Sequence, residues 1–194
     1  MQKLLICGDS FAADWTVKFK ESYGWVNLLS KEYKITNLAQ AGCSEYKILK
    51  QLRSVNLKHY DKIIVSHTSP YRLYTDRHPV HNKDCLHQNS CLIYSDINEH
   101  VNNYPELQSL KDFFENYFNF EYFEHIHNLL CAEIENYCPD FTLHVTNIDW
   151  KNLYNFKNWL ELKNIFENYR GSINHYDEEG NKIVFEKIME RLKT

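Results

Sequence analysis

Apolar residues along the chain occur either in short continuous runs or at helical spacing, and the two patterns alternate. The run Leu4 to Cys7 ends at Gly8, which predicts a buried strand that leads into a turn. Ser44 is a plausible N-cap for a helix whose apolar side carries Tyr46 and Ile48. In chain order, the pattern predicts strands at 4–7, 33–38, 61–67 and 141–149, with helices at 21–31 and after Ser44.

The periodicity fails between residues 68 and 105, where polar and turn residues predominate. A loop of this length inside a compact domain is uncommon and is often a lid or a binding loop. Beyond Pro105 the apolar spacing predicts one or two amphipathic helices, packed as a core stripe and ending near Pro139. A helix that carries Phe156, Trp159, Leu160 and Phe166, and a last helix after Gly180, complete the expected elements.

Strands that alternate with helices indicate a parallel sheet. We therefore expect a three-layer α/β/α fold with a flavodoxin-like sheet and an active site at the carboxyl ends of its strands. The 194 residues predict a single domain over 1–194, with an inserted loop or lid at about 68–105. A chain of this length buries about 70% of its unfolded surface and needs no disulfide framework.

Composition narrows the choice of partners. The 22 basic and 26 acidic residues give a net charge of -4 without any block of lysine or arginine, so a nucleic-acid partner is not expected. The six cysteines form no CxxC pair, which favours reduced thiols. No stretch approaches the roughly 20 apolar residues of a membrane span, and we expect a cytoplasmic protein with no membrane partner and an unknown oligomeric state.

Ser10 lies just beyond the first predicted strand, where active sites form in open α/β sheets. A serine hydroxyl needs a neighbouring base, normally an imidazole, and donors that stabilise the oxyanion formed on its substrate. Two loops at other strand ends could supply them. One contains Gly42 and the other, just before the last helix, contains His175.

Three blocks resemble the SGNH/GDSL hydrolase family: GDSF at Gly8–Phe11, NLAQAGCS at 37–44 and NHYDEEGN at 174–181. The resemblance implies an esterase that works through an acyl-enzyme and needs no cofactor or metal. Ser10 would be the nucleophile, His175 the base, and the backbone amides of Ser10 and Gly42 the oxyanion donors. We expect a small-molecule or glycan ester as substrate, with an O-acetylated glycan preferred.

Two positions depart from the family pattern. The third block normally supplies an asparagine to the oxyanion hole, whereas the chain has SHTSPYR there, and the hydroxyl of Ser69 is a candidate replacement. The position of the triad carboxylate, three residues before His175, is Ser172. Three options stay open: Asp149 orients the imidazole, a backbone carbonyl does so in a Ser–His dyad, or the site is catalytically impaired.

Two other functions remain as alternatives. His67, His78, His81 and His87, with Asp84, could hold a metal ion for a metal-dependent hydrolase, although the HExxH arrangement is missing. The other is a binding protein that keeps the SGNH fold without catalysis. The simplest interpretation of the loop is a polar lid whose histidines face the cleft or solvent. Asp9, His67 and Arg72 are candidate substrate contacts.

Overall fold

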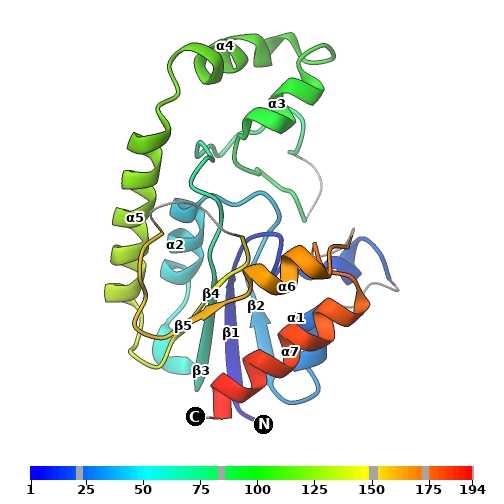
Figure 1. Cartoon of the computed structure of the whole chain (residues 1–194), viewed down its shortest axis with the longest axis vertical. Coiled ribbons are helices and arrows are strands. Elements are labelled where there is room, and N and C mark those ends of the chain that lie inside the picture. The colour runs from blue at the N-terminus through cyan, green and yellow to red at the C-terminus, as the bar shows by residue number, and fades with distance from the viewer. Residues whose placement is uncertain (21–23, 83–85, 149–152, 172–174, 194) are drawn as a thin grey trace.

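A five-stranded, all-parallel sheet forms the centre of the computed structural model, which describes residues 1–20, 24–82, 86–148, 153–171 and 175–193 (Figure 1). The strand order is β2-β1-β3-β4-β5, which is the flavodoxin-like order and confirms the expected fold class. The strands are β1 (Lys3–Gly8), β2 (Lys34–Asn37), β3 (Lys62–Ser66), β4 (Leu143–Thr146) and β5 (Trp159–Glu161).

The order of the strands reverses between β1 and β3, and this reversal fixes where a ligand can bind. Gly8 at the end of β1 pairs with Ser66 at the end of β3. The chain leaves both strands at the same edge, so the loops that follow them diverge and open a crevice. Ser10 and His67 both lie at this edge.

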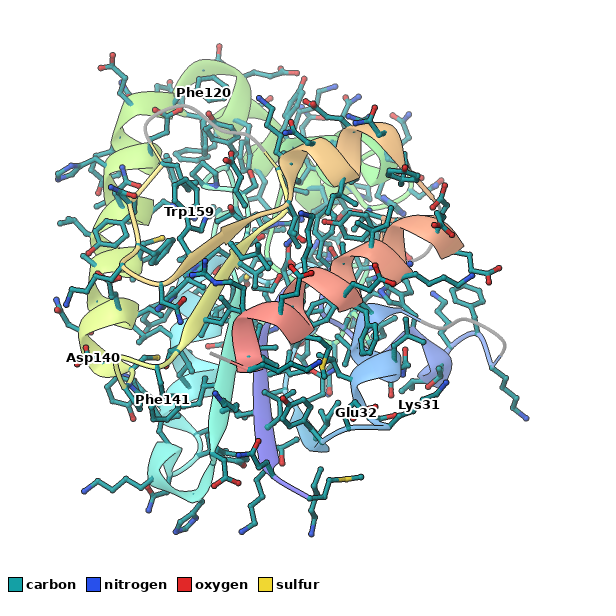
Figure 2. The ribbon with its side chains drawn as sticks, turned by 60° about the horizontal axis from the view of Figure 1, so that its bottom comes forward. Lys31, Glu32, Phe120, Asp140, Phe141 and Trp159 are labelled. Atoms are coloured by element: carbon teal, nitrogen blue, oxygen red, sulfur yellow. The ribbon has the colours of Figure 1, made fainter. Side chains whose placement is uncertain are left out.

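Helices cover both faces of the sheet and make three layers. Helices α1 (Trp25–Leu29), α6 (Lys163–Asn168) and α7 (Glu178–Lys193) share one core with the sheet, and α2 (Glu45–Arg53) and α5 (Phe120–Tyr137) share the other. In Figure 2, Asp140 and Lys31, which follow α5 and α1, lie on opposite sides of the sheet.

The segment 68–105 is more ordered than its polar sequence predicts. Its described part forms α3 (Tyr94–His100) and an antiparallel bridge between Leu73 and Leu92. Together with α4 (Gln108–Asn116), α3 lies beyond the carboxyl edge of the sheet and encloses a small apolar cluster that includes Leu92 and Ile97 (Figure 1). The apolar residues of this segment are too widely spaced in sequence to show periodicity, and they pack against one another and against Leu110 and Phe114 of α4.

Three other expectations about the helices were wrong. The stretch around Trp159 forms the short strand β5, because it pairs with β4 through Val145 and Leu160. In α2 Ile48 is buried as expected, together with Leu49 and Leu52, but the buried side also carries Glu45, and Tyr46 is exposed. The core stripe predicted after Pro105 is interrupted, because α4 has no buried residue and α5 buries His127, Cys131 and Ile134.

The described residues also form three short 3-10 helices at Trp15–Val17, Leu57–His59 and Pro105–Leu107. The five cysteines of the described residues are buried free thiols. Among the helices of the described residues, none has the length and apolar character needed to cross a bilayer.

Candidate active site

The structure brings Ser10 and His175 into contact although 165 residues separate them in sequence. The Ser10 hydroxyl donates to Nε2 of His175 at 2.8 Å. Ser10 follows β1, and His175 precedes α7, whose packing against α1 fixes it to the same side of the sheet. This distance is within the range expected for a nucleophile and its general base.

His175 is held by its backbone and by an aromatic ring. Its φ of 60° lies in the left-handed region, which is strained for a residue with a Cβ and is often found at functional sites. Its ring packs on Phe11, with 4.4 Å between the ring centroids. Burial, together with the positive charge of Arg72, lowers the pKa of His175 to about 4, so the imidazole is neutral and able to accept a proton at neutral pH.

The third member of a triad is not identified within the described part of the chain. No described carboxylate hydrogen-bonds to His175, for which Ser10 is the one side-chain partner found there. Asp149 and Ser172, the two positions considered from the sequence, lie outside the described residues. The described residues alone therefore present a Ser–His pair supported by Phe11.

Gly42 occupies a position that only glycine can fill. Its φ is 73°, and a Cβ there would lie 2.4 Å from Cβ of Ser90. Its carbonyl accepts the backbone N–H of Cys91 at 2.7 Å, which ties the loop to the 68–105 segment. Within the described residues, neither the Gly42 amide nor the Ser10 amide donates to another backbone group, so both are available to an oxyanion.

A cavity of about 470 Å³, called here the Ser10 cavity, opens in front of these groups. Its volume is in the range of small-molecule sites. Ser90 is buried in its wall, and no described group hydrogen-bonds to its hydroxyl. The lining residues are Ser10, Trp15, Ala41, Gly42, Arg72, His81, His87, Ser90, Cys91, Ile93, Asp96, Glu99, His100 and His175.

Asp9 is buried beside the nucleophile and does not line the Ser10 cavity among the described residues. Its Oδ1 accepts the backbone N–H of Phe11 at 3.1 Å, which shapes the turn that carries Ser10. Burial raises the pKa of Asp9 to about 7, against the opposing effect of the Arg72 charge. Asp9 is thus placed to hold the turn, in contrast to the substrate contact considered from the sequence.

Ser69 is placed in a second cavity of about 280 Å³, and not with Ser10 and Gly42. Its Oγ accepts the backbone N–H of Tyr71 at 3.3 Å. The second cavity is lined mainly by apolar and aromatic side chains, and Arg72 is the one described residue that lines both cavities. Ser90, and not Ser69, shares the Ser10 cavity with Ser10 and Gly42.

His67 lies in a buried network instead of facing a cavity. Its Nδ1 donates to Oε1 of Glu45 at 2.7 Å, and its Nε2 is 2.9 Å from Nδ1 of His144. Burial alone would raise the pKa of Glu45, but the charge of His67 and hydrogen bonds from His127 and His67 outweigh it and lower this pKa. Burial lowers the pKa of His144 to about 3, with a further contribution from His67.

The same network extends to α5, and the sequence analysis missed this part. Nε2 of His127 donates to the Thr68 carbonyl at 2.9 Å and is 3.2 Å from Oε2 of Glu45. Cys131, one turn later, lies 3.6 Å from Nδ1 of His127. A signal was present, because His127, Cys131 and Ile134 share one face of a helix, and polar side chains on an apolar face need buried partners. We call these five residues, Glu45, His67, His127, Cys131 and His144, the buried network.

Of the four histidines considered as metal ligands, His67 lies in the buried network and His78 and His81 lie together in the 68–105 segment. The ring of His87 lies next to that of His81, with 5.6 Å between their centroids, and Asp84 lies outside the described residues. Donor atoms of His78, His81 and Asp96 all lie within 4.8 Å of one another, and so do those of Glu45, His67 and Cys131. The backbone N–H groups of Val80 and His81 donate to Nδ1 of His78 at 3.2 and 3.1 Å, so the proton of a neutral ring is on Nε2.

That Nε2 lies 3.0 Å from Oδ2 of Asp96, whose Oδ1 accepts from Nε2 of His81 at 2.8 Å. The contacts of these histidines counter the effect of burial and lower the pKa of Asp96 to about 2. A metal ion would require the unprotonated nitrogen that His78 does not offer in this arrangement. The geometry at Asp96 therefore favours a carboxylate held by histidines over a metal ligand set.

No family model matches the sequence, and no curated protein matches it. Among solved structures, the chain is similar to a "putative GDSL-like lipase" from Parabacteroides merdae ATCC 43184, with a TM-score of 0.48. The two are 12% identical, over 99% of this chain and 95% of that chain. Function is therefore inferred from the geometry of the Ser10 cavity.

Proposed function

We propose that the protein is a serine esterase of the SGNH/GDSL type that hydrolyses small acyl esters. The observation that carries the proposal is the 2.8 Å hydrogen bond from Ser10 to Nε2 of His175 at the wall of a cavity that also exposes Gly42. The depressed pKa of His175 supports its role, because a general base must be neutral to accept the proton.

In the first half of the reaction, Oγ of Ser10 attacks the acyl carbon while its proton passes to Nε2 of His175. The negative charge that forms on the carbonyl oxygen is bound by the amides of Ser10 and Gly42. The bond between the acyl carbon and the alcohol oxygen then breaks, and the alcohol takes the proton from His175. The acyl group remains on Ser10 as an ester.

In the second half, His175 removes a proton from water, which attacks the acyl-enzyme. The acid leaves and the proton returns to Ser10 through His175. Ser90 replaces the asparagine that the family pattern would supply as third oxyanion donor. Its buried hydroxyl has no partner among the described residues and lies beside Gly42, in the wall of the same cavity.

An O-acetylated glycan is the substrate class that suits this cavity best. Tryptophan, arginine and histidine side chains line it, and such groups stack on sugar rings and hydrogen-bond to hydroxyls. The apolar cavity next to it is separate, and Arg72 contributes to the walls of both. The lining of the Ser10 cavity is more polar than that of the second cavity, which favours a short acyl group over a long acyl chain.

The proposal is tested by acetate release from acetylated sugars and short acyl esters, with an active-site-directed phosphonate as a second readout. We expect wild-type protein to turn over at least one ester and to be labelled. Ser10→Ala should lose more than about a thousandfold in kcat, as for other nucleophile deletions, and should resist labelling while its unfolding midpoint is retained. Folded wild-type protein that neither reacts nor is labelled would support the binding-protein alternative.

A further inference from the structure

Arg72 stands between the two cavities and close to the groups proposed to react. It contributes to the walls of both the Ser10 cavity and the apolar second cavity. The charge of Arg72 lowers the pKa of His175 and opposes the rise in the pKa of Asp9. Arg72 therefore interacts electrostatically with both titratable groups beside Ser10. The side chain is half-buried and follows the end of β3 on the SHTSPYR loop.

The guanidinium has no acceptor within the described part of the chain. Its Nε is buried and makes no hydrogen bond there, and no described carboxylate pairs with Arg72. An arginine withdrawn from water without a partner carries a free-energy cost, so such side chains are normally paired. The carboxyl of Asp9 interacts electrostatically with Arg72, but burial raises the pKa of Asp9 to about 7, which weakens Asp9 as a charged partner at neutral pH.

The other charged groups of the Ser10 cavity do not neutralise Arg72. Asp96 accepts from His81 and lies 3.0 Å from His78, so its charge is already matched within the 68–105 segment. Glu99 is exposed on α3. Among the described lining residues of the Ser10 cavity, Arg72 therefore carries a positive charge that no described carboxylate pairs with.

We propose that Arg72 binds a negatively charged oxygen group, a carboxylate or a phosphate, on the ester substrate. The inference rests on the esterase function proposed above and narrows its substrate class to anionic acyl esters, such as acetylated acidic sugars. A planar guanidinium offers several donors in a fork that matches both groups. The ligand would complete the hydrogen bonding of Arg72 and place its ester group before Ser10.

The test compares sugars that differ only at C6: glucose, glucuronic acid and glucose 6-phosphate, each acetylated at position 2, 3 or 4. Wild-type kcat/KM should be about ten- to a hundredfold higher for an anionic ester than for the neutral ester acetylated at the same position, as a charge-assisted hydrogen bond allows. Comparing the glucuronic acid esters with the glucose 6-phosphate esters shows whether the site prefers a carboxylate or a phosphate. Higher salt should reduce the preference, because it screens a partly exposed charge.

Variants at Arg72 locate the source of that preference. Arg72→Gln should bring the ratio of anionic to neutral kcat/KM close to one, and Arg72→Lys should give an intermediate ratio because it keeps the charge without the fork. Arg77→Gln is the matched control, since Arg77 is an exposed arginine of the same loop and lines neither cavity. It should leave the ratio unchanged.

A binding measurement separates failure of this inference from failure of the esterase function. Ser10→Ala protein should bind glucuronate or glucose 6-phosphate more tightly than glucose in calorimetry, and adding Arg72→Gln should abolish the difference. If this difference in binding is found but wild-type protein hydrolyses no ester, the esterase function is refuted and the anion site is supported. Wild-type hydrolysis with equal kcat/KM for neutral and anionic esters would refute the anion site. So would an Arg72→Gln variant in which kcat/KM falls by the same factor for both kinds of ester.

Discussion

Two groups of polar side chains lie near the carboxyl edge of the sheet, and they differ in how completely their hydrogen bonds are satisfied. In the buried network, each ionisable side chain has a described partner, although all are nearly inaccessible to water. In the Ser10 cavity, Arg72 and Ser90 each keep a buried polar atom without a described partner. Buried polar atoms are rarely left unpaired in native proteins.

This difference in hydrogen bonding indicates a structural role for the buried network and a ligand-binding role for the Ser10 cavity. A satisfied network around the Glu45 carboxylate holds two loops together, because Glu45 follows the Gly42 loop and His67 follows β3. Donors beside a nucleophile for which the described residues provide no acceptor are available to a ligand. Two of the six buried unpaired side-chain atoms found among the described residues are donors of Arg72 and Ser90, which line the Ser10 cavity.

The largest effect should come from breaking the satisfied network. Glu45→Gln removes the negative charge that His67 and His127 face, and leaving buried groups without their charged partner typically costs about 3–5 kcal/mol. The free energy of unfolding, measured with urea, should fall by an amount of that order. A change below about 1 kcal/mol would show that the network is not held by charge.

The matched control is Glu133→Gln, which removes a glutamate on the surface of α5 that pairs with Arg53. Both side chains of that pair are 47% exposed. Exposed ion pairs contribute little, so the free energy of unfolding should change by less than about 1 kcal/mol. Equal losses in the two variants would mean that burial is not what makes Glu45 important.

The sequence predicts the sheet well because its strands have local signals. The run Leu4 to Cys7 and the run Ile63 to Val65 are continuous apolar segments, and they lie in β1 and β3. Strand β5 was missed because three residues are too few to show a period, and its pairing with β4 is a tertiary contact.

The proposed site shows a similar division. The GDSF and Gly42 blocks and the late histidine are local patterns, and the structure brings Ser10, Gly42 and His175 to one cavity. Ser90 and the buried network depend on contacts between segments far apart in sequence. A polar residue such as Glu45, with an ordinary helix start as its only local context, gives no sign of the two histidines that surround it.

A smaller effect is expected from Ser90→Ala, which removes an unsatisfied hydroxyl from the Ser10 cavity. If Ser90 donates to the oxyanion, kcat for an ester should fall by about a hundredfold, as it does when one oxyanion donor is removed. The free energy of unfolding should stay constant or rise by roughly 1 kcal/mol, because a buried donor without a partner is lost. A loss of stability without a loss of kcat would refute this role.

Ser66→Ala provides the contrast, because the Ser66 hydroxyl is buried but paired. It accepts from Nδ2 of Asn147 at 3.0 Å, and Asn147 in turn accepts from the Tyr176 hydroxyl at 2.8 Å. Removing it leaves the Asn147 amide unpaired, so the free energy of unfolding should fall by about 1–3 kcal/mol. Ser66→Ala should thus lower the free energy of unfolding, whereas Ser90→Ala should leave it constant or raise it.

The smallest effect concerns pH. The base must be neutral, and the pKa of His175 is lowered to about 4 by burial and by the Arg72 charge, so kcat/KM for a neutral ester should rise through pH 4 and change little from pH 6 to 8. Arg72→Gln removes a cation that disfavours the imidazolium and should move this acid limb to higher pH, whereas Arg77→Gln should not. If kcat/KM of the wild type instead rises near the ordinary histidine pKa of about 6.5, His175 has a negatively charged partner. The described Ser–His pair would then not be the complete set of catalytic residues.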